Sequence, residues 1–190
     1  MSKNRPIGLY DSGVGGLTVV REVFAQMPSE RVLYFGDTLR VPYGSRSASE
    51  LLQFNREILH FMVNQGVKLV LVACNTSCAV ALPALRAEFS VPIMGIIDAG
   101  AQAAVGTGRR IGVIATEATI KSGAYDRAIK SLSPEATVLG QACPTLVPLV
   151  ESGRWDGPEA LEIIRDALLP LMGEKLDTLS LGCTHVPLLA

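Results

Sequence analysis

Short apolar runs rich in Val, Ile and Leu alternate along the chain with longer stretches of helical pattern. The runs are continuously apolar, which is typical of parallel strands buried on both faces. They predict strands at Ile7–Tyr10, Arg31–Phe35, Leu69–Ala73, Ile93–Ile97, Ile111–Ala115, Ala136–Gln141 and Thr178–Leu181. Strand and helix in alternation predict an α/β fold built on parallel sheets with helices on both faces.

Amphipathic stretches between these runs are expected to form the covering helices. They predict helices at Gly16–Gln26, Ala48–Gln65, Ser77–Phe89, Ala99–Val105, Ile120–Leu132 and Pro158–Met172. The start of the second helix is marked by Ser47 and Glu50, which have the spacing of a capping box.

Two segments of the chain, Leu71–Thr76 and Leu179–His185, follow one plan. Each is an apolar strand that ends in a small residue, then a cysteine, then small polar residues. Their cysteines are separated by about the length of one small domain. The sequence therefore predicts two pseudo-symmetric α/β lobes, residues 1–97 and 98–190. A ligand cleft is expected where the carboxyl ends of their strands meet.

Composition limits the range of partners. The 190 residues are 48% hydrophobic and 18% charged, as in ordinary globular proteins, and the net charge is -1. Such a chain has no general attraction for nucleic acid or for a membrane surface, so a small molecule is the expected partner. The apolar runs are too short to cross a bilayer, and no signal-peptide core is recognisable. A cytoplasmic location with reduced thiols is expected.

The four cysteines then call for a role other than disulfide bonding. Cys74 and Cys183 follow strands, where backbone amides and a helix dipole favour a thiolate, and a modestly lowered pKa would provide a base near neutral pH. Burial as small apolar residues is the alternative, but their matching positions favour chemistry. Cys78 with Cys74, Cys183 and His185 would make a Cys3His zinc set. No Cys-x2-Cys pair accompanies them, so no metal site is predicted, and Cys78 and Cys143 are interpreted as packing residues.

Three other segments carry polar groups suited to a small ligand. Asp11 and Ser12 open a glycine-rich turn before a helix, which suits a carboxylate or phosphate, although Asp11 as a simple helix cap is the alternative. Tyr43 and Gly44 lie in a turn-rich loop that offers amides and a phenol, or is only a surface turn. His185 is close enough to Cys183 to assist proton transfer, whereas His60 is interpreted as a structural or a surface residue.

Together these motifs resemble glutamate racemases. The resemblance rests on Asp11–Val19, Gly36–Thr38 with Pro42–Gly44, Ala73–Thr76 and Gly182–His185. It implies a cofactor-independent isomerase of two pseudo-symmetric lobes that interconverts L- and D-glutamate for peptidoglycan synthesis, and hence for cell-wall biogenesis and cell shape.

The resemblance also implies roles for individual residues. Cys74 and Cys183 would carry the protons, with Asp11 assisting near the first and His185 near the second. The residues implied in substrate binding are Asp11, Ser12, Tyr43, Gly44, Asn75, Thr76, Thr184 and His185. Val186 stands where the family usually has an aromatic residue. Family members continue past the position of Ala190, so the second lobe is expected to be incomplete.

Other functions stay open on the sequence. A racemase acting on aspartate or another amino acid would share the thiol pair. A decarboxylase or isomerase of the same superfamily could also use cysteine, although two opposed thiols favour racemisation. A non-catalytic amino-acid-binding or regulatory protein is the alternative from a different class. The sequence leaves the oligomeric state, a homodimer included, undecided.

Overall fold

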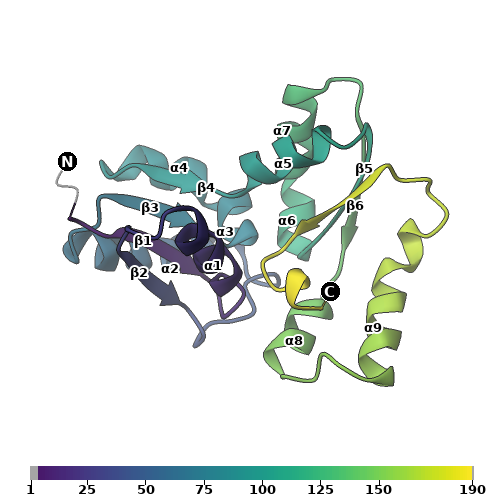
Figure 1. Cartoon of the computed structure of the whole chain (residues 1–190), viewed down its shortest axis with the longest axis horizontal. Helices are drawn as coiled ribbons and strands as arrows, with labels where there is room; N and C mark the ends of the chain where they lie inside the picture. The colour runs from purple at the N-terminus through teal and green to yellow at the C-terminus, as the bar shows by residue number, and fades with distance from the viewer. Residues whose placement is uncertain (1–3, 190) are drawn as a thin grey trace.

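Two parallel sheets organise residues 4–189, the part of the chain that the computed structural model describes (Figure 1). The first sheet has the strand order β2-β1-β3-β4, and every neighbouring pair is parallel. Its elements are, in chain order, β1 (Ile7–Asp11), α1 (Leu17–Gln26), β2 (Val32–Gly36), α2 (Ala48–Asn64), β3 (Leu69–Val72), α3 (Asn75–Val80), α4 (Leu82–Glu88) and β4 (Ile93–Gly95).

The second sheet repeats the arrangement of the first three strands. Its order is β6-β5-β7, again all parallel, so that the first strand of each lobe lies between the second and the third. Its elements are α5 (Ile97–Val105), β5 (Arg110–Ala115), α6 (Glu117–Ser122), α7 (Ala124–Leu132), β6 (Thr137–Ala142), α8 (Leu146–Glu151), α9 (Pro158–Leu168), the 3-10 turn η1 (Leu169–Leu171), β7 (Thr178–Gly182) and the 3-10 turn η2 (Val186–Leu189). The predicted α/β fold with two parallel-sheet lobes is confirmed.

The predicted lobe boundary between residues 97 and 98 falls in the first turn of α5, just after the chain leaves β4. Residues 1–3 and 190 of the two predicted lobes lie outside the described residues. Within residues 4–189, no helix combines the length and apolar character needed to span a membrane.

Two predicted helices are each divided in the structure. The stretch Ser77–Phe89 contains α3 and α4, which separate at Ala81 because Pro83, in the first turn of α4, has no N–H with which to continue the preceding helix. The stretch Ile120–Leu132 belongs to α6 and α7, which meet at Gly123 with φ +67°. Glycine accepts this left-handed conformation without steric cost, so the chain can turn there.

One strand is less buried than its apolar sequence predicts. Leu179 and Leu181 of β7 are each 39% exposed, whereas the strand was expected to be buried on both faces. Both side chains lie on the same side of β7. On that side they line a shallow hollow together with Ile164 and Leu168 of α9. An apolar run therefore predicted the strand but not the coverage of its second face.

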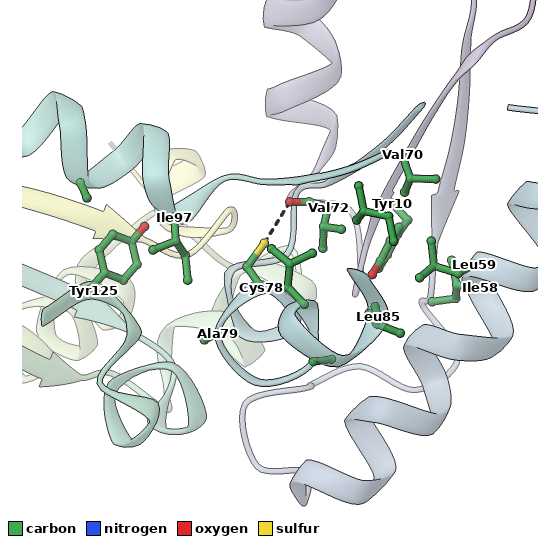
Figure 2. Packing of buried hydrophobic residues seen from close by; sticks show 14 of the residues in the cluster. Tyr10, Ile58, Leu59, Val70, Val72, Cys78, Ala79, Leu85, Ile97 and Tyr125 are labelled. Carbon is green, nitrogen blue, oxygen red and sulfur yellow. Dashed lines mark hydrogen bonds between the residues drawn. The ribbon is translucent and has the colours of Figure 1, made fainter. Parts of the chain in front are cut away.

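The main hydrophobic core is continuous across both lobes (Figure 2). Tyr10 and Val70 enter it from the first sheet, and Ile97 and Tyr125 enter it from the second lobe. Cys78 on α3 lies between these groups. Because apolar burial is the main stabilising contribution to a fold, a shared core holds the two sheets in one relative orientation. The groups at their strand ends are thereby held at fixed relative positions.

Candidate active site

The carboxyl ends of strands from both sheets meet at a small cavity. The cavity includes residues that follow β1 and β3 in the first lobe and β5 and β7 in the second. Its lining residues are Ser12, Tyr43, Gly44, Cys74, Asn75, Thr76, Thr116, Val147, Cys183, Thr184 and His185. The lining therefore contains every residue named from the sequence as catalytic or substrate-binding except Asp11, and adds Thr116 and Val147.

Cys74 is held at the start of α3. The chain leaves β3 at Val72, and Cys74 is the N-cap of the helix, where its sulfur accepts a hydrogen bond from the Ser77 amide at 3.5 Å. Only 4% of Cys74 is exposed. The side chain that caps the helix thus also lies on the cavity wall.

Cys183 occupies the corresponding place after β7. Its sulfur lies 3.8 Å from His185 Nδ1, and both side chains are buried. The expected proximity of His185 to Cys183 is therefore present, within the longer range that hydrogen bonds to sulfur have. A ring nitrogen beside a thiol can accept or return its proton.

Burial dominates the acidity of both thiols. The pKa of Cys183 is raised from 9.0 to about 12, mainly by loss of hydration and also by the nearby Asp11 charge, and the His185 amide opposes the shift. The pKa of Cys74 is also raised by burial and by Asp11, and hydrogen bonds from Ser77 and Ser12 oppose the shift. The prediction of a lowered thiol pKa is therefore wrong, because desolvation of the thiolate outweighs the backbone amides that favour it.

Asp11 connects the two lobes next to the cavity, where it contacts the lining residue Thr184. One carboxylate oxygen accepts the amides of Gly13 and Gly16 at 3.2 and 3.1 Å, which holds the turn before α1. The other oxygen accepts the Thr184 hydroxyl at 3.1 Å, and Thr184 belongs to the second lobe. Burial raises the pKa of Asp11, opposed by the charge of His185 and by these hydrogen bonds. Asp11 therefore does more than cap a turn, since it fixes the segment next to Cys183.

Glu151 contacts a residue of the cavity wall, and the sequence interpretation did not single it out. It ends α8, an element that was not predicted, and its Oε1 atom lies 2.6 Å from His185 Nε2. A carboxylate at this distance orients the imidazole ring. The sequence offered one indication of Glu151: it is the single charged residue between Glu135 and Arg154.

The Tyr43 loop reaches across to the second lobe. The Tyr43 hydroxyl donates to Asp37, and Asp37 forms an ion pair with Arg40 at 2.6 Å. Gly44 lies against Thr116 so closely that a Cβ atom at position 44 would be 2.8 Å from the Thr116 Cβ. Only a glycine at position 44 permits this close approach to Thr116. The loop is therefore part of the cavity wall and not merely a surface turn.

Threonine hydroxyls join the lobes at the same place. The Thr76 hydroxyl lies 2.8 Å from that of Thr116 and 3.3 Å from that of Thr119. Thr116 caps α6 by accepting the Thr119 amide. The sequence interpretation singled out Thr76 but not its two partners, since a threonine before a helix is ordinarily a simple cap.

The remaining cysteines are packing residues, whereas His60 is exposed on α2. Cys78 belongs to the main core and donates to the Val72 carbonyl at 3.2 Å (Figure 2). Cys143 is buried in a second apolar cluster with Val186. His60 stacks edge-on against Phe89 with ring centroids 4.9 Å apart. In residues 4–189, no three His, Cys, Asp or Glu side chains converge in a way that would hold a metal ion.

Fold and site together define a two-lobed α/β protein with a pair of thiols in one cavity between the lobes. The chain belongs to the Asp/Glu/Hydantoin racemase family, whose profile matches residues 16–190. Among its relatives, the glutamate racemase of a Picosynechococcus species is 51% identical over 183 residues, which cover 96% of this chain and 66% of that protein. The predicted resemblance to glutamate racemases is confirmed, and the chain spans about two thirds of this relative's length.

Solved structures of glutamate racemases have the same fold. Isoform RacE1 from Bacillus anthracis superimposes with a TM-score of 0.95 at 45% identity, over 99% of this chain and 71% of that chain. The enzyme from Francisella tularensis, determined in complex with D-glutamate, has a TM-score of 0.93 at 35% identity, over 99% of this chain and 72% of that chain.

Proposed function

We propose that this chain interconverts L- and D-glutamate without a cofactor, using Cys74 and Cys183 as an acid–base pair. One observation carries the proposal: the two buried thiols follow corresponding strands of two sheets and line the same cavity. The names of the relatives supply the substrate, since those described above are glutamate racemases and one was determined with D-glutamate. In a bacterial cell, the D-glutamate formed would serve peptidoglycan synthesis.

The proposed reaction moves one proton off Cα and another onto it. A thiolate on one lobe takes the Cα proton, and the electron pair of the broken C–H bond passes into the adjacent carboxylate. The thiol of the opposite lobe then gives its proton to the other face of Cα. The product is the mirror-image amino acid, and the two sulfurs have exchanged protonation states. Walls that exclude water and donors aligned on the carboxylate stabilise the charge that develops.

The raised thiol pKa values fit this scheme when the substrate is considered. Burial by the protein alone favours the protonated form of both sulfurs, because a buried thiolate is poorly solvated. A bound amino acid brings an ammonium group, and a nearby positive charge favours the thiolate over the thiol. We therefore infer that substrate binding itself helps to generate the base.

Two charged groups are suited to assist the thiols. His185 contacts Cys183 and is oriented by Glu151, so it would move the proton of the second thiol. Asp11, whose charge is close enough to raise the pKa of both thiols, would assist at Cys74. The substrate's carboxylates and ammonium would be bound by the hydroxyl, amide and phenol groups of Ser12, Tyr43, Gly44, Asn75, Thr76 and Thr184.

The test is to incubate L-glutamate with the purified chain in heavy water, with no added cofactor. Circular dichroism should decay toward zero, and early D-glutamate should carry deuterium at Cα while the remaining L-glutamate stays protiated. The reason is that the donating thiol exchanges with solvent, whereas the abstracting sulfur returns the proton it took. Product that retains the substrate's own proton would contradict the two-thiol mechanism.

Two further outcomes would identify other functions. Racemisation of aspartate in place of glutamate would assign a different substrate to the same thiol pair. Glutamate binding without any exchange at Cα would identify an amino-acid-binding protein. Cys78→Ser provides the matched control, because Cys78 is buried like the two proposed thiols but lies in the core outside the cavity lining.

A further inference from the structure

A single tyrosine of the second lobe reaches the first lobe behind the cavity. Tyr125 lies on α7, and its hydroxyl donates to the Asn75 side-chain oxygen, Oδ1, at 2.7 Å. Both side chains are buried, with 5% and 4% exposed. Asn75 directly follows Cys74 and lines the cavity. The hydrogen bond thus joins the second lobe to the residue beside the first thiol.

The ring of Tyr125 also contacts the residue beside the second thiol. A Cβ atom added to Gly182 would lie 3.0 Å from Tyr125 Cε2, and one added to Gly100 would lie 3.1 Å from the hydroxyl oxygen. Gly182 ends β7 and directly precedes Cys183. In Figure 2 the ring of Tyr125 lies beside Ile97, in the core that both lobes share. Ring and hydroxyl are therefore both fixed in place.

The hydrogen bond decides which face the Asn75 amide presents to the cavity. An asparagine side chain carries an acceptor oxygen and a donor NH2 group on the same carbon. Burial raises the pKa of Tyr125 above its ordinary value, so the hydroxyl keeps its proton and stays a donor. With Oδ1 taken by this donor, the NH2 group is left for the cavity. An amide turned the other way would set its oxygen against a bound carboxylate, which repels it.

We propose that Tyr125 is a positioning residue for the substrate: it fixes the Asn75 amide so that its NH2 group donates to a carboxylate of the bound amino acid. The inference rests on the proposed function, since it takes an amino-acid substrate as given. It assigns a binding role to a residue of the second lobe that does not line the cavity.

The first test is Tyr125→Phe, which removes the hydroxyl and keeps the ring against Gly182. The KM for glutamate should rise about tenfold, because a hydrogen bond to a charged group is lost in part, while kcat changes much less. Tyr10→Phe is the matched control. Tyr10 makes an equivalent buried hydrogen bond to Asn55 at 2.6 Å outside the cavity lining, so its removal should lower the melting temperature and leave KM unchanged.

Coupling to Asn75 separates positioning from general support. Asn75→Ala should raise KM by itself, and adding Tyr125→Phe to Asn75→Ala should change KM by less than about twofold. An undiminished effect of Tyr125→Phe in the Asn75→Ala background would overturn the proposal. In the unsubstituted chain, the side-chain NH2 resonances of Asn75 should shift on glutamate binding, and resonances that stay unchanged at saturation would overturn it even if Tyr125→Phe fails to fold.

The unsubstituted chain distinguishes this inference from the proposed function. Absence of both racemisation and glutamate binding in it would refute the function, and the inference with it. Racemisation with the same KM in the unsubstituted chain and Tyr125→Phe would refute the inference alone.

Discussion

At the scale of single residues, Cys74 and Cys183 differ from Cys78 and Cys143 by what surrounds them. All four are buried, but only the first two line the cavity between the lobes. Cys143 and Cys78 contact carbonyl oxygens of the core. The exposed fraction of the side chain does not distinguish the two cavity cysteines from the two core cysteines. The polar residues around each sulfur do distinguish them.

Cys74→Ser and Cys183→Ser should each lower kcat about 10²–10⁴-fold, because a serine hydroxyl is a much weaker acid than a thiol and cannot supply the base. Cys78→Ser should change kcat little and lower the melting temperature, since it places a hydroxyl in an apolar core. Racemisation rates and thermal unfolding of the three variants measure the contrast. Full activity in Cys183→Ser would exclude a second thiol from the reaction.

The raised pKa of Cys183 also predicts how stability depends on pH. Below about pH 9 the thiol is protonated in the folded and unfolded chain, and its contribution to stability is complete. Above this the unfolded thiol ionises, while the folded thiol keeps its proton until about pH 12, so rising pH favours unfolding.

The difference in unfolding free energy between the unsubstituted chain and Cys183→Ala should therefore fall by about 1.4 kcal/mol from pH 8 to pH 10. Urea unfolding at both pH values measures this difference. A value that is the same at pH 8 and pH 10 would mean that the folded thiol is as well solvated as the unfolded one.

At the scale of secondary-structure elements, short helices that follow strands position the site and longer helices support it. The longest helix, α2, begins with a complete capping box: the Ser47 hydroxyl accepts the Glu50 amide, and the Glu50 carboxylate accepts the Ser47 amide at 2.9 Å. This helix supplies Leu51 to the cluster that contains Tyr43 and Cys74. The first turn of α2 therefore supports two residues of the cavity wall, Tyr43 and Cys74.

Ser47→Ala should lower the unfolding free energy by about 1 kcal/mol, because the first turn of α2 loses its capping acceptor. Ser131→Ala is the control, since Ser131 donates to the Ala128 carbonyl within α7 and caps no helix. Urea unfolding of both variants should show the loss for Ser47→Ala alone. Equal stability of Ser47→Ala and the unsubstituted chain would mean that another group replaces the cap.

At the scale of the whole molecule, the two lobes are in contact at backbone distance. A Cβ atom at Gly15 would lie 2.6 Å from the Thr184 hydroxyl, 2.8 Å from the Thr184 carbonyl carbon and 2.8 Å from His185 Nδ1. The backbone carbon cannot move aside as a flexible side chain would. Closure of the lobes therefore depends on the absence of a side chain at this position.

Gly15→Ala should push the lobes apart and lower kcat/KM about a hundredfold, the effect expected when reacting groups are displaced by about 1 Å. Gly106→Ala is the control, because a Cβ there meets no atom closer than 3.4 Å. Small-angle X-ray scattering should give a larger radius of gyration for Gly15→Ala only. Unchanged scattering and unchanged kcat/KM would show that the segment around Thr184 yields locally.

The strands and the two-lobed α/β class followed from the sequence, because apolar runs of strand length are a local pattern. The two cavity cysteines were predicted from their matching positions at strand ends, whereas Asn75, Thr76 and Thr184 were implied by the resemblance to glutamate racemases. The sequence did not predict the breaks at Ala81 and Gly123, where a proline and a left-handed glycine end helices that periodicity alone would continue.

The contacts between the lobes became known from the three-dimensional fold alone. Glu151 reaches His185, and Tyr125 reaches Asn75, across separations that no local pattern encodes. The tertiary structure also reversed the expected direction of the thiol pKa shifts. The amides at a strand end favour a thiolate. Burial of the sulfur in the folded chain removes water from it, and this desolvation has the larger effect on the thiol pKa.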